Sequence, residues 1–181
     1  VQSPEVEPEP GGGMIGVVVG MWWFTRKRKI SFLKVSDVVV TVAPIGLFFG
    51  RLANFVNGEL WGKPTSVPWA MIFIKTRGGP EPRHPSQLYE AGLEGLLLFA
   101  FLQLRFWKSP SAQTQPGRIA GEFLIAYALA RSLGEIFREP DEGVSLILGL
   151  SRGTFYSLFM IVAGVALIAY ASRGKALQRK A

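Results

Sequence analysis

Three apolar stretches of this 181-residue sequence contain charged and amide side chains that such stretches normally exclude. A charge at bilayer depth costs about 3 kcal/mol on insertion, so these side chains usually face a polar cavity or a charged partner. They are Arg51, Asn54, Asn57 and Glu59 in or beside 36–58, Glu90 and Glu94 in 85–107, and Glu122, Arg131, Glu135 and Arg138 in 117–138. Arginine suits phosphate, because its planar guanidinium stays charged and donates two parallel hydrogen bonds. The pattern favours a site for an anionic phospholipid headgroup.

Helical spacing places several of these side chains on shared faces. Arg51 and Asn54 lie on one helix face with Gly58. Residues three or four positions apart are neighbours on the surface of a helix. Four polar residues with this spacing would form one stripe along a second helix: Tyr127, Arg131, Glu135 and Arg138. We therefore expect three separate segments, 51–59, 84–90 and 131–141, to bring their polar groups to the same depth.

Each of these residues also has a simpler interpretation. Arg131 and Glu135 would form an ion pair within one helix, and Arg51 would extend its charged end to the membrane surface. Capping of a helix or turn is the alternative for Asn57, Glu59 and His84, and packing is the alternative for Tyr127 and Tyr89. The clustering of all these groups on one side is what favours a functional interpretation.

Five apolar stretches carry these residues and predict the fold class. They are 11–25, 36–58, 85–107, 117–138 and 152–171. With 49% apolar residues and a mean hydropathy of +0.27, the chain is more apolar than an ordinary soluble domain. About 20 residues are needed to span a bilayer. The sequence predicts an all-α, polytopic integral membrane helix bundle of about five spans.

The segments outside these stretches complete the predicted organisation. Residues 1–10 are rich in Pro and Glu and are expected to be a disordered tail. Residues 11–181 are expected to form one transmembrane unit, and 60–84 a short outer loop or cap.

Lysine and arginine are concentrated in alternate connections, which predicts an orientation. Five spans place twelve cations on one face, which the positive-inside rule makes cytoplasmic. They are Arg26, Lys27, Arg28, Lys29, Lys34, Arg105, Lys108, Arg118, Arg173, Lys175, Arg179 and Lys180. The polar stripes, the 60–84 loop and His84 then lie on the outer side, and the C-terminus on the cytoplasmic side.

Composition argues against several other classes of protein. The sequence has no cysteine and one histidine, so it offers neither a thiol nucleophile nor a cluster of His and Cys ligands for a metal. Although the net charge is +7, the basic residues lie between membrane spans, which argues against nucleic-acid binding. A transporter would be expected to show repeated halves, and no repeat is detectable.

Two long segments resemble a known family. GRLANFVNGELWGKP (50–64) and PRHPSQLYEAGLEG (82–95), together with 117–141, are similar to signatures of the prolipoprotein diacylglyceryl transferase family. The resemblance extends over residues 11–181. It implies an all-helical enzyme of the bacterial inner membrane, with its active site on the outer, periplasmic side.

The resemblance also implies a reaction and a set of site residues. The diacylglyceryl group of phosphatidylglycerol would be transferred to the lipobox cysteine of a prolipoprotein, releasing glycerol phosphate, without a metal or another cofactor. Partners would be phosphatidylglycerol, the prolipoprotein signal peptide and membrane lipid. The implied catalytic residues are Arg51, Arg131 and His84. The implied substrate-binding residues are Arg51, Asn54, Asn57, Glu59, Gly62, Tyr127, Glu135 and Arg138.

The sequence departs from the family pattern at its N-terminal side. Gly11 stands where the family has a histidine, and the family's N-terminal spans have no counterpart here, which indicates an N-terminally truncated member. The alternative hypothesis is therefore a catalytically inactive family member that only binds anionic phospholipid.

Overall fold

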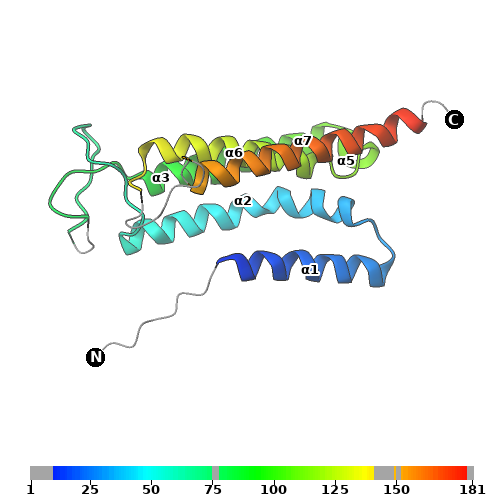
Figure 1. The fold of residues 1–181 in the computed structure, drawn as a ribbon, viewed down its shortest axis with the longest axis horizontal. Coiled ribbons are helices and arrows are strands. Elements are labelled where there is room, and N and C mark those ends of the chain that lie inside the picture. Colours follow the sequence, from blue (N-terminus) through cyan, green and yellow to red (C-terminus); the bar gives the residue numbers. More distant parts are fainter. Residues whose placement is uncertain (1–9, 75–77, 141–148, 150–151, 179–181) are drawn as a thin grey trace.

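In the part of the chain that the structure describes, five long helices run roughly along one another (Figure 1). The computed structural model describes residues 10–74, 78–140, 149 and 152–178, with side chains described between residues 13 and 174. The elements are α1 (Pro10–Arg28), α2 (Phe32–Asn57), α3 (Ser86–Glu90), η1 (Ala91–Leu97), α4 (Leu98–Lys108), α5 (Ser111–Thr114), α6 (Arg118–Phe137) and α7 (Arg152–Gln178). Because α3, η1 and α4 are continuous, the five long helices match the five predicted apolar stretches, and the all-helical fold class is confirmed.

The helices expose apolar side chains as a membrane protein does. Helix α2 and residues 152–174 of α7 are long and apolar enough to cross a bilayer, and only 17% of the most apolar window of each is buried. The core helix of a soluble protein would be mostly buried instead. That α1, the α3–η1–α4 helix and α6 also span the membrane remains a prediction.

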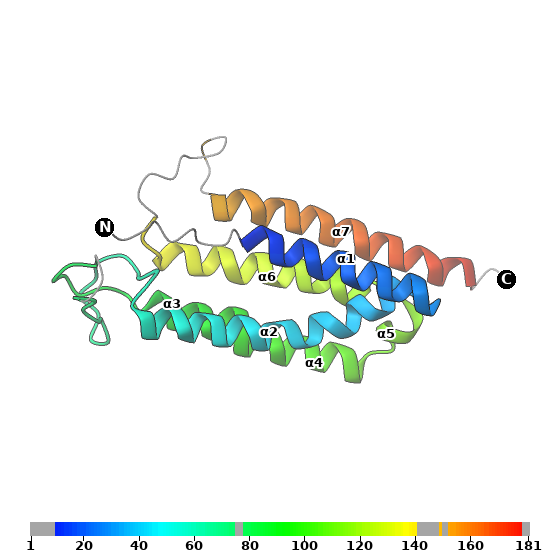
Figure 2. The ribbon, with the colours of Figure 1, turned by 90° about the horizontal axis from the view of Figure 1, so that it is seen from below.

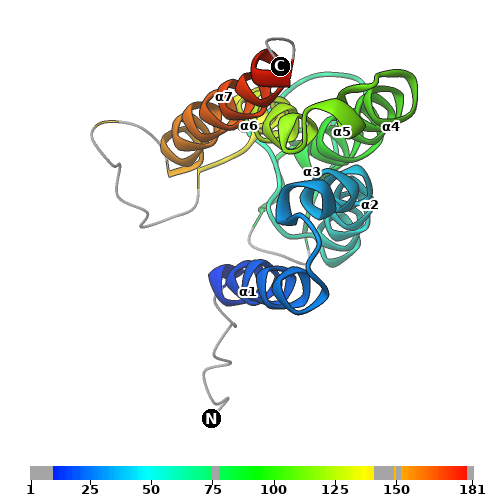
Figure 3. The same ribbon diagram turned by 90° about the vertical axis from the view of Figure 1, so that its right-hand side faces the viewer.

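Helix α6 lies at the centre of the packing. Figures 2 and 3 show α7 alongside α6, and α2 beside the α3–η1–α4 helix, while α1 lies outermost next to α2. A small buried core of Leu98, Leu102 and Ile119 joins α4 to α6. Helix α2 and the α3–η1–α4 helix, which follow each other in sequence, therefore both lie beside α6. This packing turns the polar stripes of α2 and α6 toward each other.

Glycines allow α6 and α7 to cross closely. A Cβ atom on Gly121 would lie 2.8 Å from the carbonyl oxygen of Gly164, and one on Gly164 would lie 2.7 Å from the carbonyl oxygen of Gly121. Small residues permit such contacts between membrane helices. By contrast, Cβ atoms on Gly46 and Gly50 of α2 would meet no atom of another described helix within 4 Å.

A buried carboxylate ties α2 to the start of α6. The Oδ2 and Oδ1 atoms of Asp37 accept hydrogen bonds from the backbone N–H groups of Gly117 and Ala120, each at 2.8 Å, and Asp37 is only 1% exposed. The first N–H groups of a helix have no partner within the helix, so a carboxylate there satisfies them and complements the helix dipole. Asp37 thereby sets the position of α6 relative to α2.

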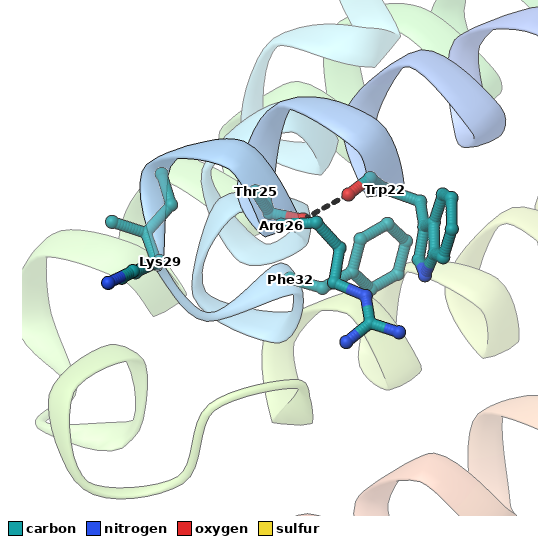
Figure 4. A pocket seen from close by; sticks show the side chains of 6 residues that line it. Trp22, Thr25, Arg26, Lys29 and Phe32 are labelled. Carbon is teal, nitrogen blue, oxygen red and sulfur yellow. Dashed lines mark hydrogen bonds between the residues drawn. The ribbon is translucent and has the colours of Figure 1, made fainter.

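The basic residues gather at this same end of the bundle. The α1–α2 turn, the α4–α6 connection and the end of α7 all lie there (Figure 1). A shallow hollow at this end is lined by Trp22, Thr25, Arg26, Lys29, Ile30 and Phe32 (Figure 4). The Arg26 guanidinium lies 5.3 Å from the centre of the Trp22 ring. Tryptophan and basic residues together are typical of a membrane surface. Arg179 and Lys180 lie outside the described residues.

The connection between α2 and α3 folds into a cap at the opposite end. Its backbone pairs with the end of α6 through a bridge between Gly62 and Arg138, and with itself through bridges from Arg83 to Pro64 and Met71. The Arg83 side chain donates to the carbonyl oxygens of Gly78 and Gly62 at 2.7 and 3.2 Å. In the described part of this connection, hydrogen bonds therefore hold the backbone as a cap on the end of the bundle.

Candidate functional site

Two arginines from separate helices meet on one pair of buried glutamates. From α2, Arg51 Nη1 lies 2.9 Å from Glu90 Oε2, and Arg51 Nε donates to Glu94 Oε2 at 3.1 Å. From α6, Arg131 Nη1 donates to Glu90 Oε1 at 3.1 Å and lies 4.0 Å from Glu94 Oε1. The four side chains form a single ion-pair cluster, which we call the arginine–glutamate cluster.

The glutamates and the arginines of the cluster differ in the exposed fraction of their side chains. The side chains of Glu90 and Glu94 are 0% exposed, whereas those of Arg51 and Arg131 are 14% and 18% exposed. The carboxylates therefore lie beneath the guanidinium groups. An anion that approaches from outside would meet the arginines first.

Local backbone features make this arrangement possible. Glu90 and Glu94 fall at the junction of α3 with the π-helical segment η1, and such wider turns are frequent at functional sites. Gly134 allows α6 to come close, because a Cβ atom there would lie 3.0 Å from Glu90 Cγ. A side chain at Gly134 would require the Glu90 side chain or α6 to move by a few tenths of an ångström.

Two further residues of the predicted stripe on α6 join the cluster. Glu135 Oε2 lies 3.4 Å from Arg131 Nη2, so the predicted ion pair within the helix is present, but Arg131 also binds Glu90. Tyr127 is within electrostatic range of the two arginines and of both buried glutamates, and its ring stacks on Phe123 with a centroid distance of 5.9 Å. The structural and functional interpretations of the stripe are therefore compatible.

His84 belongs to a neighbouring aromatic group rather than to the hydrogen bonds of the cluster. Its Nδ1 lies 3.0 Å from the hydroxyl oxygen of Tyr89, which accepts a hydrogen bond from Trp69 Nε1 at 2.6 Å. The ring of Phe137 packs edge-on against His84, with centroids 5.2 Å apart. His84 thus lies at the cap, between the first turn of α3 and the end of α6.

The remaining predicted residues lie at this same end. Gly62 is closely enclosed, since a Cβ atom would lie 2.5 Å from the His84 carbonyl oxygen and 2.6 Å from that of Phe137. Arg138 ends α6 in an extended conformation, opposite Gly62. On α2, Asn54 is half-buried, and its carbonyl oxygen accepts from Glu59 N at 2.9 Å. The side chains of Asn57 and Glu59 are exposed.

Several residues with a part in this geometry were not predicted as site residues. Glu90 and Glu94 could be recognised as costly charges in an apolar stretch, yet nothing in the sequence shows that they bind Arg51 and Arg131. Their spacing of four residues was the available signal. Asp37 and Tyr89 have partners that are distant in sequence or that depend on the cap.

Apolar exposed helices around a buried arginine–glutamate cluster near one end define a helical membrane protein. The model of the prolipoprotein diacylglyceryl transferase family matches residues 11–170. The chain belongs to this family.

Relatives with the name phosphatidylglycerol–prolipoprotein diacylglyceryl transferase share about half of the aligned residues. The protein from Zymomonas mobilis is 52% identical over 158 residues, covering 87% of this chain and 54% of the relative. The one from Rhodospirillum rubrum is 52% identical over 168 residues, covering 92% and 60%. The one from Idiomarina loihiensis is 50% identical over 163 residues, covering 90% and 59%. The chain thus spans little more than half the length of these relatives.

Proposed function

We propose that the arginine–glutamate cluster binds the phosphate of phosphatidylglycerol, and that the chain transfers the diacylglyceryl group to the thiol of a prolipoprotein's lipobox cysteine. The observation that carries this proposal is the convergence of Arg51 and Arg131, from α2 and α6, on one pair of buried glutamates. The names of relatives about 50% identical support the choice of both substrates.

The geometry suits the charge that develops in such a transfer. The thiol sulfur forms a bond to a glycerol carbon while the bond from that carbon to the phosphate oxygen breaks. Glycerol phosphate leaves with the electron pair, and the thiol proton is released. Guanidinium groups stabilise the leaving phosphate more strongly as its charge grows, and fixing both substrates supplies the required orientation. The exposed side chains at the cap, including Glu59, are available to contact the headgroup or peptide.

We further propose that the cap faces the periplasmic side of the bacterial inner membrane. Support comes from the basic residues gathered at the other end of the bundle, which the positive-inside rule assigns to the cytoplasm. This orientation would admit phosphatidylglycerol and the signal peptide from the outer leaflet.

A transfer assay tests the function. The chain, in phosphatidylglycerol vesicles, is incubated with a lipobox peptide, and mass spectrometry records the gain of one diacylglyceryl group. We expect a gain that falls at least about a hundredfold in Arg131→Ala, because a preorganised group for the leaving charge is lost. Arg131→Lys should recover little, since an ammonium cannot donate a planar fork.

The matched control is Arg118→Ala. Arg118 also pairs with a glutamate on α6, at 3.4 Å from Glu122, but at the opposite end of the bundle. Its turnover should be close to that of the unsubstituted chain. Unchanged turnover in Arg131→Ala would contradict the assigned role. Phospholipid binding without any transfer would support the alternative of an inactive, lipid-binding family member.

A further inference from the structure

The charges of the cluster do not match those of its proposed ligand. Arg51 and Arg131 supply two positive charges, whereas Glu90, Glu94 and Glu135 supply three negative charges when all are ionised. These five groups, when fully ionised, would therefore carry a net charge of −1. A phosphate diester brings another negative charge into a site where solvent screening is weak.

Two of the three nitrogens of each guanidinium group already contact a carboxylate. Arg51 Nη1 and Nε contact Glu90 and Glu94 at 2.9 and 3.1 Å. Arg131 Nη1 contacts Glu90 at 3.1 Å, and its Nη2 contacts Glu135 at 3.4 Å. A phosphate that binds through these four nitrogens must share or replace their contacts, and a buried carboxylate that loses its cation is strongly destabilised. Neutralising one carboxylate would remove this conflict.

Three buried carboxylate oxygens of the cluster could hold a proton. Among the described residues, Glu90 Oε2, Glu94 Oε1 and Glu135 Oε2 accept no hydrogen bond of good geometry, although each lies near a guanidinium group. Of the three side chains, those of Glu90 and Glu94 are the more deeply buried. Both side chains are 0% exposed. Two neighbouring carboxylates in such a place favour sharing one proton over full ionisation.

The ionisable groups that face this pair come from two helices. Helix α2 contributes Arg51, and α6 contributes Tyr127, Arg131 and Glu135. On α4, which continues the same helix, the charged residues are in its last turn, at the opposite end of the bundle. Within the described residues, the groups nearest the pair are therefore those of the cluster itself.

We propose that Glu90 and Glu94 are positioning residues for both arginines, and that this pair takes up one proton when a phosphate diester binds. The inference rests on the proposed function, which supplies the anion. The carboxylates hold the guanidinium groups in place when the site is empty. Once one carboxylate is protonated, the guanidinium N–H groups of Arg51 and Arg131 can donate to the phosphate instead. The five groups, the added proton and the phosphate diester then carry a net charge of −1.

Calorimetry of the full chain in detergent tests this proposal, with dioctanoyl phosphatidylglycerol as the probe. Titration in two buffers of different ionisation enthalpy gives the number of protons taken up. We expect about one proton per lipid, and a Kd that weakens by up to about tenfold per pH unit as pH rises. Glu94→Gln and Glu90→Gln each imitate a protonated carboxylate, so each should bind the lipid without proton uptake and with a nearly constant Kd.

The matched control is Glu122→Gln. Glu122 also joins two arginines, at 2.7 Å from Arg105 and 3.4 Å from Arg118, but it lies far from the cap. Its proton uptake should equal that of the unsubstituted chain. Lipid binding without uptake in the unsubstituted chain, or uptake that persists in either cluster variant, overturns the inference and leaves the proposed function intact. Absence of lipid binding by the folded chain overturns both.

Discussion

The hydroxyl group of Tyr89 lies beside one ring nitrogen of His84. Trp69 Nε1 is only a donor, so Tyr89 accepts from it at 2.6 Å and its own hydrogen is left to donate. We predict that this hydrogen is donated to His84 Nδ1, which lies 3.0 Å away. Nδ1 is then an acceptor, and the neutral imidazole carries its hydrogen on Nε2. In this form His84 would offer a substrate a hydrogen-bond donor through Nε2.

Nitrogen NMR tests the tautomer directly. His84 is the only histidine of the chain, so labelling with [15N]histidine gives the signals of a single ring. We expect the shifts of a ring protonated at Nε2 and hydrogen-bonded at Nδ1 at alkaline pH. Tyr89→Phe should shift the Nδ1 signal because its hydrogen bond is lost. Signals from a ring protonated at Nδ1 in the unsubstituted chain would contradict this assignment.

At the scale of the elements, Asp37 positions α6 from the end opposite the site. Its two hydrogen bonds of 2.8 Å to Gly117 N and Ala120 N begin the helix that carries Arg131. Gly117 has a φ of +94°, a conformation that glycine adopts readily. Both hydrogen bonds are buried, so loss of the carboxylate deprives two buried N–H groups of their acceptor.

Removal of this carboxylate is expected to destabilise the fold. Asp37→Ala should lower the free energy of unfolding by about 1–2 kcal/mol or more, the usual cost of losing a helix cap. Asp37→Asn keeps one acceptor oxygen and should cost less. Denaturant unfolding in detergent, followed by circular dichroism, provides the measurement. As control, Glu81→Ala removes a carboxylate that is 61% exposed and 3.6 Å from Arg83, and it should change stability little. Equal stability of Asp37→Ala and the control would refute this role of Asp37.

At the scale of the whole molecule, the two ends differ in chemistry. One end has the basic connections and the hollow beside Trp22, whereas the other has the cap and the arginine–glutamate cluster (Figures 1 and 4). Positively charged connections are retained on the cytoplasmic side during insertion. The proposed orientation can therefore be tested by determining which side of the membrane each end faces.

Single cysteines can locate these ends, because the chain has no cysteine of its own. Ser66, in the cap, and Gln113, in α5, are both exposed. In intact spheroplasts, Ser66→Cys should react with a membrane-impermeant maleimide, and Gln113→Cys should react only after the membrane is permeabilised. The opposite pattern of labelling would reverse the proposed orientation. Full labelling of both after permeabilisation serves as the control for accessibility.

The positions of the helices could be predicted from the sequence alone. Apolar length is a local property, so the predicted stretch 85–107 corresponds closely to the continuous helix from Ser86 to Lys108. The alternation of basic connections depends only on the order of the spans, so the shared basic end was also predictable. The stripe from Tyr127 to Glu135 follows from the helical period, and the ion pair of Arg131 with Glu135 is local for the same reason.

The partners of the buried charges were decided only by the tertiary structure. Arg51 meets Glu94 43 residues later in the chain, and Asp37 meets Gly117 80 residues later, through packing that no local period specifies. The same holds for Gly62, whose lack of a side chain matters because two backbone carbonyl groups approach it in the folded chain. Membrane helices find their neighbours through close packing and polar contacts across helices. The sequence therefore determined which residues carry charge at membrane depth, and the tertiary structure determined which of them neutralise one another.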